Sequence, residues 1–290
     1  DGTVNSLVVP TTTVGALQTG DTTTTFVQTF NNRNAGTLKL LTPSGAVNDG
    51  NGGLNYLVTF TPVATGTIGQ RAITVTAVAD TKTYDGTTTS AGAPTISVAL
   101  GTGDTSGFVQ TFDNRNAGAG KTLTPSGVVN DGNTGLNYLV VFTPVATGTI
   151  VQRIITVTAA TNTKVYDGTT TAAALPTITS VTQLATGDTA VFAETYANKD
   201  AGTLKTLTPT ATISDGNSGL NYAVTLAPNT TGVISQKVVN VVAQRVFDTT
   251  MTFDVVAVTP HAPIAASITG TVPGETLTLA SGSGTVPSAS

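Results

Sequence analysis

The sequence predicts an all-β protein, built as a tandem array of small immunoglobulin-like β-sandwich modules. Three observations support this fold class: motifs recur every 82 to 84 residues, threonine makes up about one residue in five, and no window shows the apolar stripe of a helix. A period of this length corresponds to one small domain per repeat, and β-branched threonine favours strands. The alternative is a β-grasp-like module with a short helix, for which the stretches 172–175 and 190–197 leave room.

Three recurring motifs mark the repeats. Gly-Leu-Asn-Tyr begins at Gly53, Gly135 and Gly219, Gly-Asp begins at residues 20, 103 and 187, and Tyr-Asp-Gly-Thr begins at Tyr84 and Tyr166. Asp1-Gly2-Thr3 aligns with the last three residues of that motif, so repeat 1 lacks its first strand. The predicted bounds are 1–70, 71–152 and 153–236 for repeats 1 to 3, and 237–290 for a partial or divergent repeat 4.

Repeat 4 is identified by two weaker matches. Phe247-Asp248 stands where the Tyr-Asp pairs stand, and Gly274-Glu275 where the Gly-Asp pairs stand. The junctions carry no linker rich in glycine, serine or proline, so we expect neighbouring repeats to sit end to end with restricted bending.

Within repeat 2 the strand signals follow one another between turn clusters. The first alternates with period 2 and places Ile73, Val75 and Ala77 on one face. Clusters such as Asn130–Gly135 end the strands because Asn, Asp and Gly favour turns. The predicted strands cover residues 73–79, 94–100, 108–112, 121–124, 136–142 and 147–150.

The aromatic residues predict the core. Of the nine phenylalanines and six tyrosines, only Phe253 has no counterpart in another repeat. A chain that places its few large side chains so regularly uses them for packing. We therefore expect Tyr56, Tyr138 and Tyr222, which end the Gly-Leu-Asn-Tyr motifs, to be structural.

Composition excludes several function classes. Charged residues make up only 10% of the chain and the net charge is −4, which argues against a nucleic-acid partner and against binding to an anionic membrane. No stretch approaches the roughly 18 apolar residues of a membrane-spanning helix. Cysteine is absent, so packing rather than disulfides has to hold each module.

No residue pattern predicts catalysis or a cofactor. His261 is the single histidine, and it has no cysteine to pair with. Asp49, Asp131 and Asp215 begin Asp-Gly-Asn loops that offer oxygen ligands for calcium, but each loop has one carboxylate and no distal glutamate. The alternative interpretation is a tight turn stabilised by hydrogen bonds to the aspartate.

The Tyr-Asp-Gly motifs also have a structural interpretation. We expect Tyr84 and Tyr166 to lie half-buried at a strand end, with Asp85-Gly86 and Asp167-Gly168 making the turn. A sharper hypothesis is an amide cross-link from Lys82 or Lys164 to an asparagine on a late strand, Asn137 or Asn221. The alternative is a surface lysine whose amine reaches solvent.

One succession of motifs resembles a known family. Thr81-Lys-Thr-Tyr-Asp-Gly-Thr-Thr88 is followed by Gly103-Asp104, Phe112-Asp-Asn-Arg-Asn-Ala-Gly118 and Leu136-Asn-Tyr138, and repeat 3 keeps the same order. This resembles the YDG-type repeat of bacterial filamentous-haemagglutinin-like surface adhesins, well over residues 1–236 and poorly beyond. The resemblance implies a secreted or cell-surface bacterial protein of all-β modules, without enzymatic activity and without established ligand residues.

Two functions from different classes follow. The first is structural: a rod-like adhesin stalk, or the subunit of an extracellular fibre that assembles head to tail when the segment 238–248 adds a strand to repeat 1 of another copy. The favoured account of the incomplete end repeats is nevertheless that both are cuts from a longer chain. The second function is a carbohydrate- or receptor-binding adhesin module that recognises surface glycans, with its site expected in the non-repeating residues 251–290.

Overall fold

The computed structural model describes residues 1–13, 15–244, 252–254, 265–277 and 283–285. Every regular element in this part of the chain is a β-strand, which confirms the all-β fold class. The described residues contain no helix, and hence none long and apolar enough to cross a membrane. The stretch 190–197, considered for the helix of a β-grasp module, lies almost wholly in a strand. The chain divides into two compact units, Asp1–Gln152 and Arg153–Ser290.

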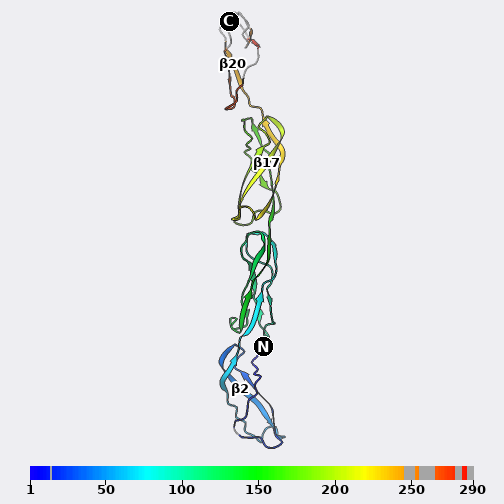
Figure 1. Cartoon of the computed structure of the whole chain (residues 1–290), viewed down its shortest axis with the longest axis vertical. Coiled ribbons are helices and arrows are strands. Elements are labelled where there is room, and N and C mark those ends of the chain that lie inside the picture. The colour runs from blue at the N-terminus through cyan, green and yellow to red at the C-terminus, as the bar shows by residue number, and fades with distance from the viewer. Residues whose placement is uncertain (14, 245–251, 255–264, 278–282, 286–290) are drawn as a thin grey trace. The chain divides into compact units, whose positions relative to one another are not determined.

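Repeat 1 forms one antiparallel sheet in the first unit. Its strands β1 (Thr22–Phe30), β2 (Gly36–Asn48) and β3 (Val63–Ile68) lie in the order β1-β2-β3; β2 is labelled in Figure 1. The chain start pairs with β1 through an isolated bridge between Asn5 and Thr29, as Thr89 pairs with Thr111 in repeat 2. The alignment of Asp1-Gly2-Thr3 with Asp85-Gly86-Thr87 is consistent with these matching bridges.

Repeat 2 has two main sheets, and its first segment contributes a strand to each. One sheet has the order β11-β4-β6 and the other β5-β12-β9-β8, while β10 and β7 form a small pair. β4 and β5 run parallel to β11 and β12, so the beginning of the repeat is paired with its end. The strands are β4 (Arg71–Thr76), β5 (Thr81–Thr83), β6 (Thr95–Ile96), β7 (Thr105–Ser106), β8 (Val109–Phe112), β9 (Gly118–Ser126), β10 (Val129–Asn130), β11 (Tyr138–Thr143) and β12 (Val145–Val151).

The core of repeat 2 has a part on each sheet. Ile73, Val75, Val129 and Tyr138 form one cluster, with Phe108 packed against it. In the other sheet the ring of Phe112 lies against Gly148, where an added Cβ would come within 2.8 Å of the ring and 2.9 Å of the Lys121 carbonyl oxygen. This close approach admits only glycine, and Gly66 and Gly232 repeat it.

Repeat 3 begins the second unit and has the same two sheets. Their orders are β15-β13-β18 and β14-β19-β17-β16, and β13 and β14 again run parallel to β18 and β19. The strands are β13 (Arg153–Thr158), β14 (Thr163–Val165), β15 (Thr177–Ile178), β16 (Thr189–Tyr196), β17 (Gly202–Ser214), β18 (Tyr222–Ala227) and β19 (Asn229–Ser235). β17 is labelled in Figure 1.

The described part of repeat 4 begins in the same way. β20 (Asn240–Gln244) pairs antiparallel with β22 (Ala265–Thr269), and Val241 lies opposite Ile268 as Val75 lies opposite Ile96 in repeat 2. β21 (Thr252–Asp254) pairs with β23 (Ser283–Thr285). Residues 245–248 of the predicted strand donor 238–248 lie outside the described part, and these include Phe247 and Asp248. His261 lies outside it as well.

One strand prediction differs from the structure, and one segment that matches a strand of repeat 2 forms no strand. The strand expected over 94–100 is limited to β6, because the Ser97 hydroxyl takes the Thr74 N–H that the next ladder position would use. Residues 56–61 match β11 in sequence but form no strand, and no described strand lies beside them as β4 lies beside β11.

Candidate functional sites at the repeat junctions

The Gly-Asp and Gly-Leu-Asn-Tyr motifs meet in each of the first three repeats. In repeat 2 the Tyr138 hydroxyl donates to Asp104 Oδ2 at 2.6 Å and accepts the Gly101 N–H at 2.7 Å. Burial, together with the Asp104 carboxylate, raises the pKa of Tyr138. The same pair joins Tyr56 to Asp21 at 2.6 Å and Tyr222 to Asp188 at 2.7 Å. Tyr138 and Tyr222 therefore hold the Gly-Asp turn against β11 and β18, and Tyr56 makes the same bond from a segment that forms no strand.

The three Asp-Gly-Asn loops also have one geometry. In repeat 2, Asp131 Oδ1 accepts the N–H groups of Asn133 at 2.7 Å and Gly135 at 2.8 Å, and Oδ2 accepts the N–H of Asn137 at 2.9 Å. Asp49 and Asp215 accept the corresponding three N–H groups in repeats 1 and 3. Burial acts to raise the pKa of Asp131, but these N–H donors outweigh it and hold the pKa below its usual value.

This geometry bears on the calcium interpretation of the loops. Both carboxylate oxygens of each aspartate already accept backbone N–H groups, which is what the turn interpretation requires. Among the described residues, no group of three or more histidine, cysteine, aspartate or glutamate side chains is placed to hold a metal ion.

The Tyr-Asp-Gly-Thr segments form a second repeated turn. Asp85 Oδ1 accepts the N–H and hydroxyl of Thr87, both at 2.9 Å, and the Lys82 amine at 2.8 Å. Asp167 accepts the same three groups in repeat 3, where the Lys164 amine lowers the pKa of Asp167 to about 2. Tyr84 is fully buried rather than half-buried, with the Arg115 guanidinium 5.9 Å from its ring centre.

The groups of the hypothetical amide cross-link bind other partners. The Lys82 amine donates to Asp85 and to the Thr87 carbonyl oxygen. Asn137 Oδ1 accepts the N–H of Ala35, in repeat 1, at 2.8 Å. Asn137 is therefore part of the junction between repeats 1 and 2.

That first junction is centred on Arg33. Its guanidinium donates to three acceptors in repeat 2: Asp104 Oδ1 at 2.7 Å, the Asp131 carbonyl oxygen at 2.7 Å and the Thr102 carbonyl oxygen at 3.0 Å. The Asp104 side chain is only 3% exposed. Asp104 thus binds Tyr138 of its own repeat with one oxygen and Arg33 of the preceding repeat with the other.

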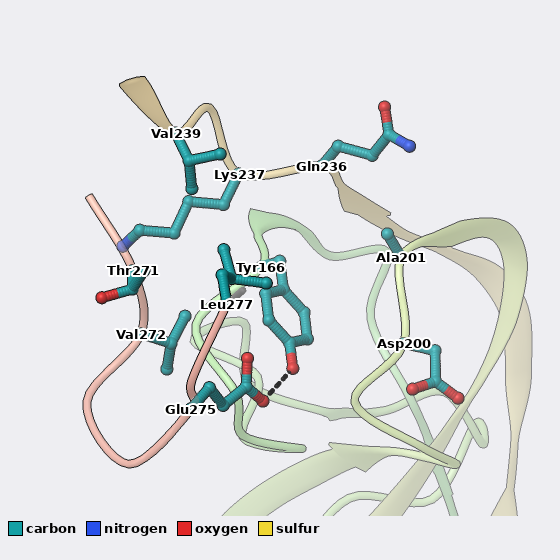
Figure 2. Close-up of a pocket in the computed structure, with 10 residues that line it drawn as sticks. All are labelled: Tyr166, Asp200, Ala201, Gln236, Lys237, Val239, Thr271, Val272, Glu275 and Leu277. Atoms are coloured by element: carbon teal, nitrogen blue, oxygen red, sulfur yellow. Dashed lines mark hydrogen bonds between the residues drawn. The ribbon is translucent and has the colours of Figure 1, made fainter. Parts of the chain in front are cut away.

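A matching junction joins repeats 3 and 4 within the second unit. The Lys199 amine, from the loop position equivalent to Arg33, donates to Glu275 Oε1 at 2.6 Å. The Tyr166 hydroxyl donates to the same oxygen, and Figure 2 shows the ring of Tyr166 directed at this carboxylate. These two donors lower the pKa of Glu275, and Glu275 in turn raises the pKa of Lys199. Glu275 therefore accepts the loop cation of the preceding repeat, as Asp104 does, but its tyrosine partner belongs to that preceding repeat.

The sequence of the two complete repeats matches a known family model. The YDG domain model matches residues 69–147 and 151–232, which together exceed half of the chain. The chain belongs to the YDG domain family. No curated protein and no solved structure was found to match it.

Each of the two junctions described above contains a cavity. At the first junction it measures about 50 Å³, and Asn137 and Tyr138 line it together with Ala35 and Arg71. Between repeats 3 and 4 it measures about 530 Å³, and the equivalent residues Ala201 and Lys237 line it together with Glu275, as Figure 2 shows.

Sequence reasoning missed the role of Arg33 and Lys199. Both occupy the second position of a loop with the pattern Asn-cation-Asn/Asp-Ala-Gly, at 32–36 and 198–202. The signal was present, because a cation recurs at one loop position in a chain with only twelve lysines and arginines. Its partner, however, follows about 70 residues later in the next repeat, where no local pattern points to it.

Proposed function

We propose that this chain is a non-enzymatic structural region of a bacterial extracellular protein. Its YDG repeats would form a rod-like stalk of a filamentous-haemagglutinin-like adhesin, or the subunit of an extracellular fibre. One observation carries the proposal: the two junctions within the described units use the same kind of cation–acid pair, Arg33 with Asp104 and Lys199 with Glu275. A cation–acid pair that recurs at both junctions is typical of a structural region in which successive modules are held in a fixed orientation.

The remaining polar clusters support the same proposal. The acidic side chains of the Asp-Gly-Asn and Tyr-Asp-Gly turns accept backbone and lysine donors in the same pattern in each repeat that contains them. Groups used in this way stabilise turns, whereas a binding or catalytic site is expected to appear once and to differ from its counterparts.

Electron microscopy of the purified chain tests the proposal, with sedimentation on the same sample. We expect extended particles of uniform length, because fixed junctions restrict bending between repeats. Polymers would identify a fibre subunit and single particles a stalk segment. Compact particles, or freely bending ones, would contradict the structural role.

The extracellular location needs its own measurement. Antibodies raised against the chain should label intact producing cells; labelling only after lysis would contradict this location. Specific retention of a glycan by the chain would instead support the alternative, a carbohydrate- or receptor-binding adhesin module.

A further inference from the structure

We propose that the loop cation is the element with which one YDG repeat recognises the next, and that it recognises the acidic residue of the Gly-Asp or Gly-Glu motif. The partner is thus a following YDG repeat rather than an unrelated domain. This inference rests on the proposed structural function and names the contact that fixes successive repeats.

The loop holds its cation ready for this contact. Asn32 Oδ1 accepts the N–H of Asn34 at 3.0 Å and also accepts the Lys39 amine, which fixes the turn on which Arg33 lies. In repeat 3, Asn198 accepts the N–H of Asp200 and the Lys205 amine in the same way. A loop fixed within its own repeat loses little conformational entropy on docking.

The acidic residue makes docking sensitive to the fold of the next repeat. Asp104 accepts the Tyr138 hydroxyl, and this bond exists only when the Gly-Asp turn and β11 are both in place. Its other oxygen, directed at Arg33, is therefore positioned by the folded repeat 2. Because a charge-assisted hydrogen bond to a buried carboxylate is strong, repeats 1 and 2 should stabilise each other through this pair.

Both junctions pair a basic side chain with an acidic one, but the residue types differ: Arg33 with Asp104 and Lys199 with Glu275. Arg33 reaches two carbonyl oxygens besides the short side chain of Asp104, which suits the forked guanidinium. Lys199 is a point charge and meets the longer side chain of Glu275. Arginine with aspartate and lysine with glutamate are therefore matched pairs, and Arg33→Lys should weaken the first junction although it keeps the charge.

Hydrogen exchange of the whole chain tests the inference, with variants R33A, D104A and the double variant R33A/D104A. The informative amides are Gly101, which donates to the Tyr138 hydroxyl, and Asp104, which donates to the Gly101 carbonyl oxygen. We expect R33A to speed their exchange about tenfold and R33K to speed it less. In the double variant, R33A should add little to the effect of D104A, since the two residues act as one pair.

Lys199→Ala is the matched control, because it removes the equivalent cation at the other junction. It should leave exchange at residues 101–104 unchanged and speed it at Glu275, whose N–H donates to the Val272 carbonyl oxygen. Unchanged exchange in R33A, or fully additive effects of R33A and D104A, would overturn the inference. If either result is found and the electron micrographs still show extended particles, only the inference fails and the proposed structural function remains. Compact particles would contradict the structural function itself.

Discussion

At the scale of residues, one buried position differs between repeats 2 and 3 in how many hydrogen bonds its side chain forms. In repeat 2 the buried side chain of Gln110 accepts the Val78 N–H at 2.8 Å and donates to the Val78 carbonyl oxygen at 2.9 Å and the Ser90 hydroxyl at 3.0 Å. Repeat 3 has Glu194 at this position and Ala172 in place of Ser90. Glu194 accepts the Ala160 N–H, but its Oε1 is buried without a hydrogen-bond partner among the described residues.

Glu194→Gln is expected to stabilise repeat 3 at neutral pH by about 1–3 kcal/mol, because the amide can donate to the Ala160 carbonyl oxygen as Gln110 does to that of Val78. Burial raises the pKa of Glu194. The favourable protonated form therefore stabilises repeat 3 at low pH, and this contribution is lost as the pH rises through the raised pKa.

The gain in stability from E194Q should accordingly shrink on acidification, and urea unfolding at several pH values would measure this change. Gln110→Glu is the matched control and should destabilise repeat 2; equal stabilities at neutral pH would contradict the argument.

At the scale of elements, the long strands carry a strained bulge. Leu38 in β2 and Leu204 in β17 have φ values of 55° and 54°, and each lies where the register shifts before a lysine. The equivalent residue of repeat 2 is Gly120, with φ 67°. Leucine is disfavoured in this left-handed region, and both leucines are more than three-quarters exposed, so packing does not offset the strain.

Leu204→Gly should therefore stabilise repeat 3 by roughly 0.5–1 kcal/mol, the relief of strain exceeding the entropy that glycine gains in the unfolded chain. Gly120→Leu should destabilise repeat 2 by about 1 kcal/mol for the converse reason. Urea unfolding of the whole chain measures both changes. A destabilising Leu204→Gly would contradict this prediction, because it would mean that contacts of the leucine side chain contribute more stability than its backbone strain costs.

The elements also show how far the sequence could predict the fold. Period-2 alternation located β4 and β13, and the recurring tyrosines located β11 and β18, because each has a buried face. The short strands β5, β7 and β10 have two or three residues and no such periodicity. The parallel pairing of the first segment with the last joins residues about 70 apart, so no local pattern could indicate it.

At the scale of the whole molecule, repetition was the part that the sequence predicted best. A period of 82 to 84 residues and the aligned aromatics are visible without a structure. The junctions were not, since Arg33 and Asp104 acquire their roles only when one repeat is placed against another. The same repetition means that a change in solvent acts on all repeats together.

Acid should therefore weaken the array as a whole. Asp49, Asp131 and Asp215 each accept three backbone N–H groups, and despite burial these donors lower the pKa of each carboxyl. A carboxylate with a lowered pKa in the folded state contributes stability at neutral pH, and this contribution is lost as the pH falls through the folded value. We expect the unfolding free energy to decline between about pH 5 and pH 2.

Asp131→Asn tests the cause of this decline. An amide has only one oxygen to accept the three N–H groups, so the variant should destabilise repeat 2 by about 1–3 kcal/mol at pH 7. The deficit should shrink as the pH falls through the lowered pKa of Asp131, because protonation then removes the ionised carboxylate from the wild type as well. Asp200→Asn, which alters a carboxylate outside these loops, is the control for the general effect of removing a negative charge. A deficit that stays constant from pH 7 to pH 2 would mean that the loop depends on its shape rather than on the ionised carboxylate.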